Sequence, residues 1–190
     1  MSSAFGNFRH NSHEISWEER IYGRTLSIKG LEDLFCRELE QATAFKELVS
    51  NWMKMATSFQ CTADLIEALD EHIEEARIQQ ANLRSLFEKL DLKPSPGKPG
   101  SEFFSYKLER RIRRTREVIR DLLVISWLQK LEHQEIAYMG TLRSFSQTLG
   151  WKETSETLYQ ILNEDRLHNH RLSEISQSVT HPGSVIVEYT

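Results

Sequence analysis

The chain lacks the features that mark a membrane-spanning or exported protein. No apolar run approaches the ~18 residues that cross a bilayer. The first residues, MSSAFGNFRHNSHE, carry no basic segment followed by an apolar core. The net charge of -4 is mild, so the protein is not built as a whole around nucleic acid. We therefore expect a cytoplasmic protein that does not associate with membranes.

Cysteine is scarce, and the familiar catalytic motifs are missing. The two cysteines, Cys36 and Cys61, form no C-x-x-C pair, which argues against a zinc–thiolate site. If each opens one of two successive helices, they lie at opposite ends of a rod roughly 30 Å long, too far apart for a disulfide. The chain has no GxxxxGK[ST] or GxGxxG loop and no Ser-His-Asp arrangement, so nothing suggests nucleotide chemistry or a nucleophilic serine.

Proline is concentrated in one segment, and helical patterns flank it. Three of the four prolines lie in KPSPGKPGS, residues 93–101, which is predicted to be a loop. The helical pattern from Glu102 to Leu149 is too long for one helix of a compact bundle, so we expect a break between Arg113 and Arg120. Gly150 is predicted to end the third long helix.

These patterns predict an all-α fold, an antiparallel four-helix bundle over residues 30–176. A short extra helix precedes the third long helix. Residues 1–29 are expected to form an N-terminal arm, and residues 177–190 a C-terminal tail.

Three predicted helices carry stripes that are apolar at both ends and polar in the middle. Steps of three and four keep each stripe on one helix face. An ionisable group there must be paired, protonated or bound to a metal, because an isolated buried charge is too costly. The stripes are Leu65, Leu69, His72, Ala76, Gln79, Leu83, Leu86, Leu90; Val124, Leu128, Leu131, Glu135, Tyr138, Leu142, Phe145, Leu149; and Leu158, Ile161, Asp165, His168, Leu172, Ile175, Val179.

Several strings of the sequence resemble the YciE/YciF family of ferritin-like proteins. They are KLEHQEIAYMGTL at residues 130–142, GLEDLFCRELE at 30–40 and DEHIEEARIQQANLRSLFEKL at 70–90. The resemblance covers about residues 30–175. It implies a ferritin-like bundle, a stress-associated role, a homodimer and an acid-rich centre similar to that of di-iron proteins.

The resemblance also implies a set of metal-ligating residues, with departures. The glutamate that the family places midway along helix one falls on Phe45, or on Lys46 in an ungapped alignment, and Gln79 and Asn169 replace stronger ligands. With Ala42 and Phe45 at that level, helix one is expected to contribute only hydrocarbon. The candidate ligands are His72, Glu75, Glu132, Glu135, Glu164, Asp165 and His168.

The chemistry of this set leaves alternatives open. A carboxylate and a histidine three residues apart share a helix face, as in bundle metal sites. The first hypothesis is a partly eroded site that binds iron or manganese weakly or not at all, with the cluster neutralising itself. The second is a working di-iron or di-manganese oxidase or peroxide-consuming enzyme. A single ion held by Glu75, Glu135, Asp165 and His168 is the more economical form of a metal site, and the pattern does not decide whether the protein is an enzyme.

A basic run between Lys107 and Arg120 is the other notable motif. It could bind nucleic acid or another anion, or it could be a solvated connector or an interface with the acidic stretch of residues 70–75. The solvated or interfacial interpretation is favoured. The arginines that would contact an anion are Arg110, Arg111, Arg113, Arg114 and Arg116.

Overall fold

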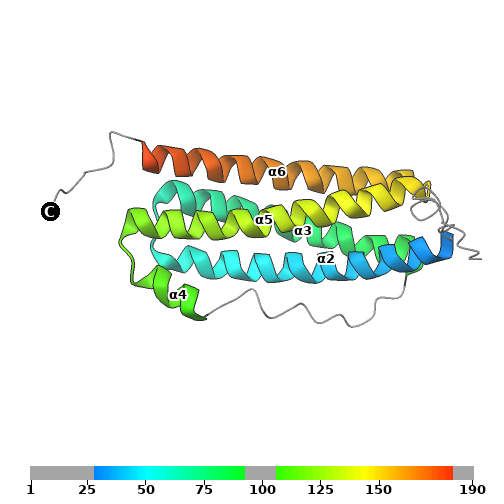
Figure 1. Ribbon diagram of the computed structural model, residues 1–190, viewed down its shortest axis with the longest axis horizontal. Helices are drawn as coiled ribbons and strands as arrows, with labels where there is room; N and C mark the ends of the chain where they lie inside the picture. Colours follow the sequence, from blue (N-terminus) through cyan, green and yellow to red (C-terminus); the bar gives the residue numbers. More distant parts are fainter. Residues whose placement is uncertain (1–27, 93–105, 182–190) are drawn as a thin grey trace, which may run out of the picture.

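The computed structural model describes residues 28–92 and 106–181, and within them the chain is helical with no strand (Figure 1). Most of the predicted arm, the proline loop and most of the tail lie outside these residues, and the last two residues of the predicted arm belong to α2. The elements are α2 (Ile28–Ala56), η1 (Thr57–Phe59), α3 (Ala63–Lys89), α4 (Tyr106–Arg113), α5 (Glu117–Thr148) and α6 (Lys152–Thr180).

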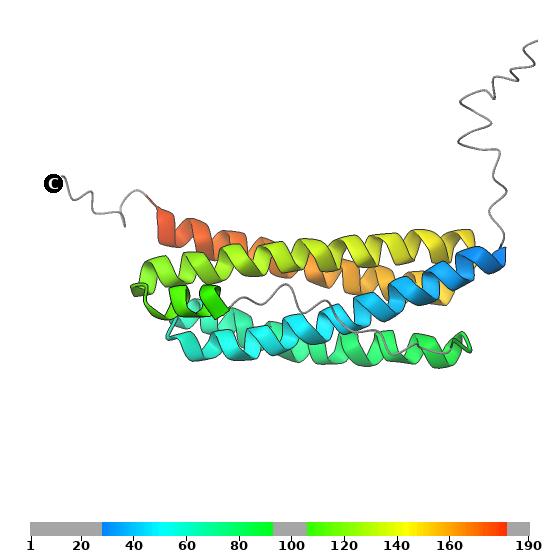
Figure 2. The ribbon, with the colours of Figure 1, turned by 60° about the horizontal axis from the view of Figure 1, so that its bottom comes forward.

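Four long helices lie side by side, and α4 covers one end (Figures 1 and 2). Helix α2 packs against α3 and α5, while α6 packs against α5 and α3. Each long helix therefore has two neighbours, and all four enclose one interior. The predicted ferritin-like four-helix bundle with a short extra helix is confirmed, although α6 continues past residue 176 to Thr180.

Short non-helical connections join η1 to α3 and α4 to α5. Gln60 has a φ of 57°, and Thr62 is extended at the start of α3. The Thr62 hydroxyl donates to Asp121 Oδ2 at 2.5 Å, which ties the start of α3 to α5 rather than capping α3. The predicted break between Arg113 and Arg120 is confirmed, since α4 ends at Arg113 and α5 begins at Glu117.

The interior consists of two apolar clusters with a polar layer between them. One cluster surrounds Val49, Leu65 and Leu128, and the other surrounds Leu39 and Leu158. Burying each large apolar side chain contributes about 1.5–3 kcal/mol to the stability of the fold, so the clusters at both ends of the bundle stabilise the helix packing. The polar side chains that lie buried at the middle level are Lys46, His72, Gln79, Glu132, Glu135 and Asp165.

Two glycines test how the helix ends are specified. Gly150 has a φ of +75°, and a Cβ there would meet no atom within 4 Å, as is also true of Gly140 inside α5. We expect Gly150→Ala to lower the free energy of unfolding by about 1 kcal/mol, because an L side chain is strained in this conformation. Gly140→Ala should instead raise it by about 0.5–1 kcal/mol. Urea denaturation measures both, and equal effects of the same sign would contradict the assignment of Gly150 as the helix stop.

Candidate metal centre

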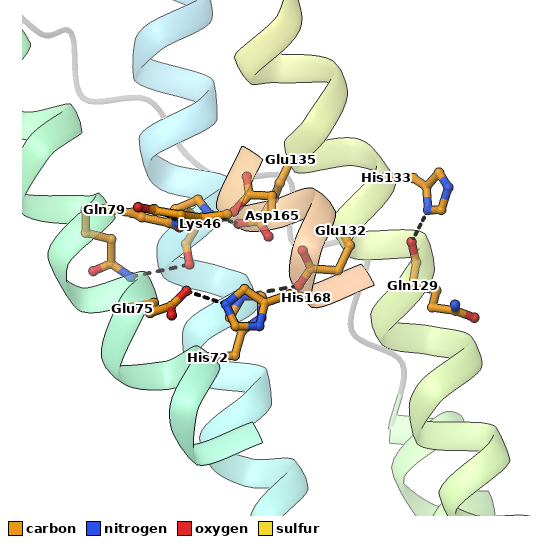
Figure 3. A network of polar contacts seen from close by, with 12 residues as sticks. Lys46, His72, Glu75, Gln79, Gln129, Glu132, His133, Glu135, Asp165 and His168 are labelled. Atoms are coloured by element: carbon orange, nitrogen blue, oxygen red, sulfur yellow. Dashed lines mark hydrogen bonds and ion pairs between the residues drawn. The ribbon is translucent and has the colours of Figure 1, made fainter. Parts of the chain in front are cut away.

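A lysine lies at the centre of the polar layer. Lys46 of α2 is fully buried, and its Nζ donates to Gln79 Oε1 at 2.5 Å and to Asp165 Oδ1 at 2.9 Å (Figure 3). The same Nζ lies 3.1 Å from Glu135 Oε1. One ammonium group therefore contacts side chains from α3, α5 and α6, and joins all four long helices.

The expectation that helix one contributes only hydrocarbon is wrong. Ala42 and Phe45 are buried as predicted, but Lys46 is also buried and reaches the centre of the bundle. The sequence contained a signal for this position, because the fully buried stripe of α2 also advances by steps of four and three. That stripe is Phe35, Leu39, Ala42, Lys46, Val49, Met53 and Ala56.

Electrostatics keep Lys46 charged. Burial by itself would lower the pKa of Lys46, but the carboxylates of Glu135 and Asp165 outweigh it and raise that pKa above its usual value. Asp165 is completely buried and accepts a hydrogen bond from the ammonium. Lys46 and Asp165 therefore form a charge-balanced pair inside the bundle.

Two histidines lie together beside the lysine. The ring centroids of His72 and His168 are 3.9 Å apart, and His72 Nε2 lies 3.2 Å from Glu132 Oε1. Burial, with the nearby charges of His168 and Lys46, holds the pKa of His72 well below its usual value. Burial and the neighbouring Glu135 and Asp165 raise the pKa of Glu132 well above its usual range. Both shifts favour a neutral pair of imidazole and carboxyl group.

The remaining predicted ligands lie at the edge of the layer. His168 Nε2 contacts Glu75 Oε2, and the Glu75 side chain is about half exposed, at 47%. Glu164 accepts a hydrogen bond at 2.8 Å from Gln79 Nε2, while the Oε1 of the same amide accepts from Lys46. Gln79, one of the departures from the family pattern, thus links the lysine to Glu164.

The residues fit one metal ion better than two. Ligand atoms of His72, Glu132 and Glu135 all lie within 4.8 Å of one another and could hold an ion. On the other side of Glu135 the ammonium of Lys46 takes the position between Glu135 and Asp165 where a second cation would lie. A dinuclear centre therefore does not fit the side chains of this layer.

The histidine next in sequence to Glu132 belongs to a different environment. His133 is exposed and points away from the cluster toward Gln129 (Figure 3). His170 of α6 is also exposed, with 72% of its side chain accessible. Both lie off the predicted stripes and take no part in the centre.

The arginine run has a structural role at the corner between α4 and α5. Arg113 pairs with Glu109 at 2.9 Å and lies 4.7 Å from the ring centroid of Phe59. Arg120 donates to the carbonyl of Gln60 at 2.8 Å. The acidic stretch of α3 pairs within the chain with other arginines, at Arg77 and Arg171. The exposed members of the run are Arg110, Arg111, Arg113, Arg114 and Arg116.

The fold and the polar centre define a ferritin-like helical-bundle protein. The chain belongs to the family described as Domain of unknown function (DUF892), whose profile matches residues 30–182. It is 27% identical over 161 residues to Protein YciF of Escherichia coli (strain K12), covering 80% of this chain and 93% of that protein. The resemblance to the YciE/YciF family is therefore confirmed.

Solved structures agree on the fold. The E. coli stress protein YciF superposes with a TM-score of 0.73 at 21% identity, covering 80% of this chain and 98% of that one. YcfI from Rhodopseudomonas palustris gives a TM-score of 0.69 at 24% identity, covering 78% and 96%. Among the described residues, no helix is both long and apolar enough to cross a membrane.

The buried lysine should be essential to stability. Lys46→Met would leave Asp165 and Glu135 buried without a cation, and we expect it to lower the free energy of unfolding by about 3–5 kcal/mol. Lys54→Met, at an exposed position of the same helix, is the control and should change it by less than about 0.5 kcal/mol. Urea denaturation followed by circular dichroism measures both. Equal stability of the two variants would contradict the assigned role of Lys46.

Stability should depend on pH through Glu135. Burial outweighs the attraction of Lys46, and with the repulsion of Asp165 it raises the pKa of Glu135 from 4.5 to about 7. The folded state then binds more protons than the unfolded state between pH 4.5 and 7, so this group makes stability fall as pH rises through that window. Glu132 acts in the same direction, whereas His72, with its lowered pKa, opposes them below about pH 6.5.

Glu135→Gln tests this dependence. The variant keeps Lys46 and Asp165 as a balanced pair, so we expect it to be at least as stable as the wild-type at pH 7.5 and to lose less stability between pH 6.5 and 8. Denaturation midpoints across this pH range provide the measurement, with Glu88→Gln at an exposed position of α3 as control. An unchanged pH profile in Glu135→Gln would show that this carboxyl group is not the source.

Proposed function

We propose that this protein is a non-catalytic, stress-associated member of its family, in which the chain's own lysine replaces one cation of a two-metal centre. The observation that supports the proposal is the contact of Lys46 Nζ with Asp165, Glu135 and Gln79. The stress-associated role follows YciF, which is described as an E. coli stress protein. Assembly as a homodimer in the cytoplasm remains part of the proposal.

Charge argues against dinuclear oxidase chemistry. Two divalent ions bring four positive charges, whereas the buried carboxylates of the layer are Glu132, Glu135 and Asp165. The ammonium of Lys46 already balances one of these three negative charges. The ammonium lies between Asp165 and Glu135, so a second divalent ion could bind there only by displacing it. Oxidation by paired metals needs more anionic oxygen than remains.

The anion-binding alternative is weaker. Two arginines of the basic run, Arg113 and Arg120, hold the corner near η1 through contacts within the chain. The exposed arginines have no interleaved aromatic residues of the kind that bind single-stranded nucleic acid. Nucleic-acid binding through this run therefore stays a prediction, and the contacts within the chain favour it less than the non-catalytic role.

Ferrous iron and oxygen test the proposal. We expect the wild-type protein to bind no more than one iron per chain and to show no increase in near-ultraviolet absorbance after aerobic addition of ferrous iron. Lys46→Glu removes the ammonium and supplies the carboxylate that helix one of such a centre normally offers, so it should increase metal binding toward two ions per chain. Lys54→Glu, with the same charge change at an exposed position, should bind as the wild-type does.

The opposite result has a clear meaning. Two irons per wild-type chain, together with oxygen-dependent absorbance, would reject the non-catalytic proposal and favour the oxidase. If Lys46→Glu is folded by circular dichroism and still binds no more metal than Lys54→Glu, Lys46 is not the residue that limits metal content.

A further inference from the structure

We infer that the protein binds a single divalent transition-metal ion between His72, Glu132 and Glu135, beside Lys46. This inference rests on the proposed function, because it assigns the second cation position to the lysine. The site would hold one ion per chain, next to the ammonium of Lys46.

Unpartnered polar atoms are the first observation. Glu132 Oε2 and Glu135 Oε2 are buried and have no hydrogen-bond partner, and His72 Nε2 and Glu132 Oε1 contact only each other, at 3.2 Å. Buried polar groups are normally paired, so such a concentration of them needs an explanation. All three residues bring a ligand atom into one region, within 4.8 Å of one another. A cation at that point would satisfy them together.

The spacing suits an ion. His72 Nε2 and Glu132 Oε1 are 3.2 Å apart. Two ligands of a tetrahedral ion with bonds of ~2.1 Å are about 3.4 Å apart, so the pair needs little movement. A cavity of about 10 Å³ lies beside two of the ligands, His72 and Glu132, and the rest of its wall consists of His168, Arg171 and apolar side chains. That space holds about one water molecule, which is enough for a metal ion with its ligands drawn inward.

The negative charges that remain in the layer after Lys46 is paired match the charge of one divalent ion. Lys46 balances Asp165, its hydrogen-bond partner. When the ion displaces their protons, Glu132 and Glu135 supply two negative charges, which one divalent cation neutralises. One imidazole and two carboxylates are ligands typical of zinc, manganese or ferrous iron rather than of calcium or magnesium.

An access route from solvent runs between α3 and α6. Side-chain exposure falls from 47% at Glu75 to 11% at His168 and 5% at His72, and reaches 0% at Glu132. Figure 3 shows the contacts that join these side chains. His168 lies against the His72 ring and is held by Glu75, as a histidine beside a metal is commonly held by a carboxylate. These groups form a continuous polar path from the surface to the site.

Titration with zinc and cobalt tests the inference. Full-length protein without an affinity tag, stripped of metal by chelation, should bind one zinc ion per chain by isothermal titration calorimetry. Zinc at 100-fold above its dissociation constant should raise the melting temperature by about 5–10 °C. One equivalent of cobalt should produce visible absorption bands typical of a four- or five-coordinate ion.

Matched variants place the ion. His72→Gln and Glu132→Gln should each weaken zinc binding at least 10-fold and abolish the cobalt bands while remaining helical by circular dichroism. His133→Gln, at an exposed position next to Glu132, should bind as the wild-type does. Lys46→Glu should bind a second ion. If one of the two buried variants fails to fold, the other still tests the site, and His133→Gln remains the folded control.

The outcomes separate this inference from the proposed function. No zinc binding by the wild-type protein would overturn the single-ion site and leave the replacement of a metal by Lys46 intact. Two ions per wild-type chain at buried ligands would overturn both. One ion that survives His72→Gln and Glu132→Gln but is lost in a variant lacking His10 and His13 would be bound outside the centre, and would overturn this inference alone.

Discussion

The buried ammonium of Lys46 is the interaction on which the centre of this bundle depends. Because this ammonium is buried in an apolar interior, α3, α5 and α6 must each present a polar group at its level to receive its hydrogen bonds and balance its charge. An unpaired charge there would cost several kcal/mol, whereas the apolar clusters above and below could slide with less penalty. The lysine therefore sets the register of four helices that hydrophobic burial alone would only hold together.

The polar layer is divided into two halves with different electrostatics. In one half, the ammonium of Lys46 donates hydrogen bonds to Asp165 and Gln79. Around His72, the groups are anionic or neutral, and several of their buried polar atoms have no hydrogen-bond partner. Glu135 lies between the halves and contacts the ammonium from one side. This asymmetry is what distinguishes the centre from a symmetric two-metal site, in which cations would occupy both halves.

Much of the fold and part of the centre could be predicted from the sequence. Apolar residues at steps of three and four predicted the long helices. The stop at Gly150 follows from local backbone preference, whereas the break before Glu117 was predicted from the length of the helical pattern. The stripes also placed His72, Glu135 and Asp165 at one buried level. Lys46 was missed because a lysine beside Phe45 normally lies in solvent, and a stripe through Phe45 seemed complete without it.

What the sequence determined by itself is periodicity: which face of each helix is apolar, where that face turns polar, and where the chain must leave the helix. Those properties depend on neighbours within one or two turns. Only the tertiary structure decided the partners across the bundle, namely that Lys46 meets Asp165 and Glu135 while His72 meets Glu132. Such pairings depend on the rotation and height of four separate helices, and these are fixed by packing and charge balance over the whole interior.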